Sequence, residues 1–292
     1  MQGVGWDEAV QHPQTPTHVT LNDVRQMADE VWDELSTECN MRKDVNIYVA
    51  MDVTQPGVLA YTARTLILNS STWKPSVMFD YSGTDIEVHV NPNVPNGWYM
   101  NDGCNTGWRY DLRTVMRHEL LHGAGLSSSI REKDNAYTVG YSTTWGDECY
   151  PTFYDTQLES NGVPAVHGCS YHPTGMEVYL AGRRIYAPGE YRAGSSFSHH
   201  TEEGLLQWQL RPTTCLTLGH AEYDMLEGMG YNCSNGLYYL SSAQNTKPRW
   251  ALLLMTAGMS VSLANGTLSR KALFIMAMAS LALVTLSGLT HF

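Results

Sequence analysis

The five residues His118-Glu119-Leu120-Leu121-His122 constrain the fold and the chemistry of this chain more than any other segment. Two histidines four positions apart lie on one face of an α-helix, one turn from each other, so both rings can bind a single ion about 2.0–2.1 Å away. Glu119 follows the first histidine and projects beside that ion, where a carboxylate can accept a proton from activated water. The motif therefore predicts a helix that carries two zinc ligands and a general base.

The residues around the motif favour the same helix. Tyr110 to Leu121 is predicted to be helical, with Asp111 as its N-cap and a buried side formed by Leu112, Val115 and Met116. Gly123 and Gly125 are expected to end it, because glycine allows the chain to turn sharply without a Cβ clash. The motif thus lies on the last turns of a helix that opens into a loop.

The rest of the first 235 residues predicts a mixture of helices and strands. Apolar residues at helical spacing predict an amphipathic helix over residues 20–38 and a short final helix over residues 220–231. Strands are expected over residues 46–53, 57–64 and 85–90, whereas residues 126–198 are rich in turns and irregular. The expected class is α+β.

The run NPNVPNGWYMNDGCNTGWRYDLRTVMRHELLHGAGL, followed much later by GSSFSHHTEEGLLQ, resembles metzincin-type zinc metallopeptidases. The likeness covers roughly residues 85–235 and is closest to a leishmanolysin-like arrangement, in which a long insertion separates the helix motif from the third histidine. It implies an α+β fold with a twisted sheet, an active-site helix and a smaller irregular C-terminal lobe. The corresponding lobes would be residues 1–125 and 126–235.

The third zinc ligand must come from far along the chain. Ser128 stands where the compact metzincin pattern has its third histidine. The resemblance instead matches Ser198-His199-His200-Thr201 to the segment of the third ligand, which makes His199 the expected ligand, 77 residues after His122. The adjacent His200 is the alternative.

Two positions depart from the family's pattern. In the family, a Leu-Met pair after the third ligand supplies the methionine that forms a floor beneath the metal. The aligned pair here is Leu205-Leu206, so Leu206 stands at the methionine position, and Met225 is a later candidate for that floor. Thr201 stands where an acid is expected. Neither change removes a metal ligand or the base.

The resemblance implies a zinc-dependent metalloendopeptidase that acts on protein or peptide substrates, with Zn²⁺ held by His118, His122 and His199 and with Glu119 as the general base. One alternative is a catalytically silent cell-surface recognition or adhesion module that keeps the fold. Another is a zinc hydrolase that acts on a non-peptide bond.

Charge and cysteine content bear on partners and location. The net charge of −11, without a long basic run, argues against nucleic acid as a partner. Six scattered cysteines, none in a C-x-x-C pair, favour disulfides in an oxidising compartment. Glycosylation motifs at Asn69, Asn232 and Asn265 also indicate an extracellular or cell-surface glycoprotein, although the initial residues MQGVGWDEAV show no signal peptide.

The last segment, residues 236–292, is predicted to be a linker and a membrane anchor. All 29 acidic residues precede it, and residues 272–292 contain no Asp, Glu, Lys or Arg. A run of this length can cross a bilayer core as a helix. An apolar run that ends the sequence without a following basic cluster also resembles the signal for a lipid anchor. A transmembrane helix and a lipid anchor therefore both stay open.

Overall fold

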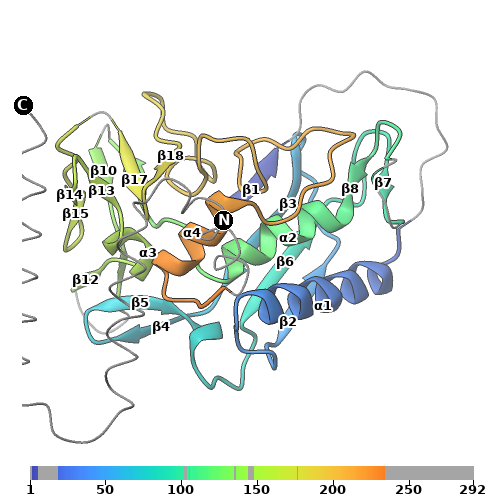
Figure 1. The fold of residues 1–292 in the computed structure, drawn as a ribbon, viewed down its shortest axis with the longest axis horizontal. Helices are drawn as coiled ribbons and strands as arrows, with labels where there is room; N and C mark the ends of the chain where they lie inside the picture. The colour runs from blue at the N-terminus through green and yellow to red at the C-terminus, as the bar shows by residue number, and fades with distance from the viewer. Residues whose placement is uncertain are drawn as a thin grey trace, which may run out of the picture. The chain divides into compact units, whose positions relative to one another are not determined.

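The structure, a computed structural model, describes residues 2–5 and 19–233, except residues 102, 103, 105, 135, 144–147 and 176. Of residues 2–5 it describes the backbone alone. The described residues fall within one unit of the chain, residues 1–239. They form a mixed α+β structure with small sheets and few helices, as the sequence predicts (Figure 1).

Helix α1 (Leu21–Glu38) forms where the sequence places its amphipathic stripe. The Thr20 hydroxyl accepts from the Asp23 amide, and the Asp23 carboxylate accepts from the Thr20 amide, so this capping box fixes where the helix begins. The buried stripe, which includes Val31 and Leu35, packs against helix α2 and strand β2. Figure 1 shows α1 running beside α2.

The main sheet has four strands in the order β1-β3-β6-β2. Their bounds are Gln2–Gly5 for β1, Ile47–Ala50 for β2, Val58–Arg64 for β3 and Ile86–Val90 for β6. Strands β2 and β6 are parallel, whereas β3 is antiparallel to β6 and β1 is antiparallel to β3. Burial alternates along β6, because one face of the sheet packs against the helices and the other does not. The three strands predicted within residues 46–90 are confirmed.

Helix α2 (Leu112–Gly123) carries the His-Glu motif and packs against α1 and against strands β3 and β6 of the sheet. As predicted, Asp111 caps it and accepts a hydrogen bond from the Thr114 amide at 2.8 Å. Gly123 lies so close to β6 that a Cβ there would stand 2.7 Å from Ile86 side-chain atoms. Gly125 has a φ of +112°, which lets the chain turn away just past the helix.

The segment that follows α2 consists of short strands and turns, as the sequence predicts for residues 126–198. Two small four-stranded sheets have the orders β15-β16-β10-β9 and β14-β13-β17-β18. The strands of this region are β9 (Arg131–Lys133), β10 (Ala136–Thr138), β11 (Tyr141–Ser142), β12 (Cys149–Tyr150), β13 (Glu159–Ser160), β14 (Val163–Pro164), β15 (Val166–His167), β16 (Ser170–Tyr171), β17 (Val178–Leu180) and β18 (Arg183–Ile185).

Smaller elements complete the described part. The helices are α3 (Phe153–Thr156), α4 (His220–Gly228) and the 3₁₀ turn η1 (Ser76–Met78). The remaining strands are β4 (Leu66–Asn69), β5 (Thr72–Pro75), β7 (Trp98–Tyr99) and β8 (Tyr110–Asp111). Helix α4 is the predicted final helix, and it ends before Gly230.

Two disulfides are present among the described residues. Cys39, just after α1, bonds to Cys233, and Cys149 bonds to Cys169. The expectation of disulfides is therefore confirmed, and the bond from Cys39 ties the end of α1 to the segment beyond α4.

No helix in the part of the chain that the structure describes has the length and apolar character to cross a bilayer. The predicted anchor within residues 236–292 and the glycosylation motif at Asn265 lie outside the described residues.

Candidate metal centre

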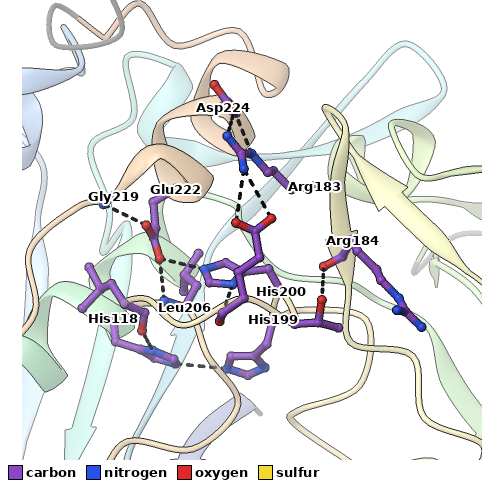
Figure 2. Close-up of polar contacts among 12 residues, drawn as sticks. His118, Arg183, Arg184, His199, His200, Leu206, Gly219, Glu222 and Asp224 are labelled. Atoms are coloured by element: carbon purple, nitrogen blue, oxygen red, sulfur yellow. Dashed lines mark hydrogen bonds and ion pairs between the residues drawn. The ribbon is translucent and has the colours of Figure 1, made fainter. Parts of the chain in front are cut away.

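Three histidines from distant parts of the chain meet at one point. His118 and His122 project from one face of α2, and His199 arrives from the loop that follows β18. The Nε2 atoms of His118 and His122 are 3.0 Å apart, and those of His118 and His199 are 3.1 Å apart. The remaining pair, His122 and His199, is separated by 3.3 Å. Figure 2 shows the rings of His118 and His199 pointing toward each other.

The outward nitrogen of each ring, Nδ1, is held by a backbone carbonyl oxygen. The acceptors are Leu205 for His118 at 2.7 Å, Leu126 for His122 at 2.7 Å and Ser195 for His199 at 2.8 Å. Because a carbonyl oxygen can only accept, Nδ1 is the protonated nitrogen, and Nε2 in the neutral ring carries a lone pair. Three lone pairs therefore face one another, which is the arrangement that a cation would bind.

Burial keeps these rings neutral. His118, His122 and His199 are at most 1% exposed. Burial lowers the pKa of His118 and His122 well below the ordinary value, and neighbouring histidines lower it further. Burial lowers the pKa of His199 to about 4. All three rings are thus in the form that binds metal at neutral pH.

The donor set fits one metal ion. The three histidines form a group whose ligand atoms lie within 4.8 Å of one another. Two nitrogens each about 2.0–2.1 Å from one tetrahedral zinc ion lie roughly 3.3 Å apart, close to the separations in this cluster. Imidazole nitrogen is a ligand that zinc accepts readily, although copper, iron and nickel accept it too.

Glu119 is fully buried beside the cluster and is held in place by strand β3. Its Oε2 accepts a hydrogen bond from the Thr62 hydroxyl at 2.9 Å, and its backbone oxygen lies 3.0 Å from the same hydroxyl. The sequence does not predict a role for Thr62, because a threonine 57 residues before the glutamate carries no signal of this contact.

The loop that carries His199 is bound to the segment after α2. The Ser128 amide donates to the Ser198 hydroxyl at 3.0 Å, so the chain just past the helix motif touches the residue before the third histidine. The His199 carbonyl oxygen also accepts from the Tyr186 amide at 2.7 Å, just past β18. Ser128, which replaces the third histidine of the compact pattern, thus helps to position His199.

His200, the alternative third ligand, points away from the cluster. Its Nε2 lies 2.8 Å from Oε1 of Glu222 on α4, and both side chains are buried. Figure 2 shows Glu222 also accepting from the backbone amides of Leu206 and Gly219, at 2.9 and 2.8 Å. His199 is therefore the histidine that completes the cluster, and His200 anchors the same loop to α4.

The two residues considered for the methionine floor lie in different settings. Leu206 is buried in the loop after His199, and its carbonyl oxygen accepts from the His200 amide at 3.1 Å. Met225 is buried on α4 in the core. The assignment of a metal floor to Leu206 or Met225 stays a prediction. Thr201 stands at the position of the expected acid, and its backbone amide donates to the Arg184 carbonyl oxygen at 3.0 Å.

Comparison of the chain with protein families, with curated proteins and with solved structures gives no match. The likeness to metzincins therefore rests on the residues themselves: the helix motif, its glycines and the segment around His199.

Proposed function

We propose that this chain is a zinc-dependent metalloendopeptidase of metzincin type. The observation that carries the proposal is the convergence of His118, His122 and His199, whose Nε2 atoms lie within 3.3 Å of one another although the third comes 77 residues after the second. If these histidines merely lay on the surface in solvent, their rings would not be buried and backbone carbonyl oxygens would not hold all three Nδ1 atoms. The mixed α+β fold, with its helix motif packed on a sheet, is compatible with the family.

The chemistry follows from the position of Glu119. When bound, zinc would lower the pKa of water and polarise the carbonyl group of a peptide. Glu119 lies one residue after His118, and its carboxylate would accept a proton from the attacking water and pass it to the leaving amine. Thr62 orients that carboxylate through its hydroxyl. A buried, oriented base supports turnover over a silent adhesion module, which has no need of one.

The setting that we propose is the cell surface or the extracellular space. Disulfides in the described part fit an oxidising compartment. Attachment to a membrane through residues 272–292 is part of the same proposal and rests on sequence alone.

Casein cleavage by the full chain tests the proposed activity. The zinc-loaded protein should cleave casein, should lose activity when zinc is removed by a chelator, and should recover it when zinc is returned. Glu119→Ala should lower the rate by about 10²–10⁴-fold while zinc stays bound, because a general base contributes that much. A zinc-loaded protein that cleaves neither casein nor short peptides would contradict the proposal.

A further inference from the structure

A cavity of about 440 Å³ is lined in part by Thr62, the residue that contacts Glu119. It lies between the end of β3 and the segment that follows α2, and its lining includes Thr62, Arg64, Ser129, Arg131 and Tyr141. Thr62 belongs both to this lining and to the hydrogen bond with Glu119. The cavity is thus beside the atoms that we propose to be catalytic.

Arg64 points to the same side of β3 as Thr62. Residues two positions apart on a strand share a face, and Thr62 points toward Glu119. The Arg64 guanidinium donates to the Ser127 carbonyl oxygen at 2.9 Å, five residues past His122. Arg64 therefore places a positive charge in the lining of the cavity, next to the segment that follows α2.

No carboxylate among the described residues forms an ion pair with that charge, and the buried Asp155 carboxylate acts on it from a greater distance. The buried Nε atom of Arg64 has no hydrogen-bond partner among the described residues. The nearby Asp155 carboxylate already accepts hydrogen bonds from Ser128, Ser129 and Thr152. The Arg64 side chain is partly buried, and burying part of a guanidinium is costly unless its donors bind an acceptor. A carboxylate is the acceptor that fits its forked geometry.

The rest of the lining leaves the cavity positive and polar. Arg131 adds a second guanidinium, which donates to the Gly140 carbonyl oxygen and lies over the Tyr141 ring. Glu132 is the carboxylate in the lining, and it is exposed. Side chains of serine and tyrosine supply further hydroxyl groups.

We infer that this cavity is a specificity pocket that binds a carboxylate of the peptide substrate through Arg64. The inference rests on the proposed function, since it assigns a substrate class to the same centre. The carboxylate could belong to an acidic side chain or to the C-terminus of a peptide, because both present the same two oxygens to a guanidinium.

Matched peptides test the pocket and distinguish the two sources. One set carries Glu or Gln at each position around a cleavable bond, and the other carries a C-terminal acid or amide. In one of the two sets, the zinc-loaded protein should cleave the carboxylate peptide with a kcat/KM about tenfold or more above that of its neutral match. This is the difference expected for a charge-assisted hydrogen bond. Arg64→Gln should abolish the preference, Arg64→Lys should retain part of it, and Arg25→Gln, at an exposed position on α1, should leave it unchanged.

Binding to zinc-loaded Glu119→Gln separates this inference from the proposed activity. If no peptide is cleaved, the activity fails, but tighter binding of carboxylate peptides that depends on Arg64 would still support the pocket. A preference for Glu identifies an acidic side chain, and a preference for the C-terminal acid identifies the terminus. Equal binding and equal cleavage of all matched peptides, or a preference that survives Arg64→Gln, would overturn the inference.

Discussion

Glu222 is a buried carboxylate that connects α4 to the loop of the third ligand. It lies 2.8 Å from His200 and accepts from the Leu206 amide, while the Leu205 carbonyl oxygen orients His118. The contribution of burial alone would raise the pKa of Glu222, but the hydrogen bonds from His200 and from the two amides lower it overall. The charged carboxylate is therefore the form that holds this loop.

Glu222→Gln should weaken zinc binding by roughly tenfold, because residues that orient metal ligands contribute about this much to affinity. The amide keeps the shape of the side chain but turns one acceptor into a donor. Competition with a chelator measures the zinc dissociation constant, and Glu203→Gln, an exposed neighbour on the same loop, is the control. Equal affinities in both variants and the unmodified protein would show that Glu222 does not position the ligands.

Thr62→Val should reduce kcat for peptide cleavage by about tenfold and leave zinc content unchanged. The substitution removes the hydroxyl that orients Glu119 but keeps the size of the side chain. Steady-state kinetics and metal analysis on the same preparation check this. A kcat equal to that of the unmodified protein would mean that Glu119 needs no support from β3.

Residue spacing predicted part of this site. His118, Glu119 and His122 follow from a helical repeat, which is local and therefore visible in sequence. The choice between His199 and His200 depends on which ring turns toward α2, and a loop has no repeat from which to infer this. Thr62 contacts Glu119 from 57 residues earlier in the chain, and Glu222 contacts His200 from 22 residues later. Contacts at these separations leave no pattern in the sequence.

At the scale of elements, the position of the metal centre depends on the close packing of α2 against β6. Gly123 makes that approach possible, because a Cβ there would stand 2.7 Å from branched atoms of Ile86, a side chain with no exposed surface. The predicted role of Gly123 was only to end the helix. Its close contact with the sheet depends on tertiary packing, which the local pattern does not specify.

Gly123→Ala should lower the free energy of unfolding by about 1–3 kcal/mol, because a methyl group would overpack the contact between α2 and β6. Chemical denaturation measures the change. Gly189→Ala is the matched control, since a Cβ at this exposed glycine would meet no atom within 4 Å. Similar unfolding free energies for the two variants would argue against a tight contact at Gly123.

At the scale of the whole molecule, the disulfide between Cys39 and Cys233 connects the end of α1 to the last described residue, 194 residues further along the sequence. The bond between Cys149 and Cys169 spans 20 residues. Sequence predicted disulfides but not these pairs, since six cysteines allow 15 pairings. The pairing depends on the fold that brings α1 and the segment after α4 together.

Replacing Cys39 and Cys233 by alanine should destabilise the protein by about 2–5 kcal/mol, because a longer closed loop restricts the unfolded chain more. The same replacement of Cys149 and Cys169 should cost less. Denaturation of both double variants under identical conditions gives the comparison. A larger loss from the shorter bond would contradict the argument from loop length.

Zinc content per chain shows whether the three histidines hold a metal ion. We would supply the full chain with excess zinc, remove unbound metal and compare the unmodified protein with His199→Ala and His200→Ala. We expect close to one zinc ion per chain, lost in His199→Ala and largely kept in His200→Ala. No zinc in the unmodified protein, or zinc kept by His199→Ala and lost by His200→Ala, would contradict this expectation.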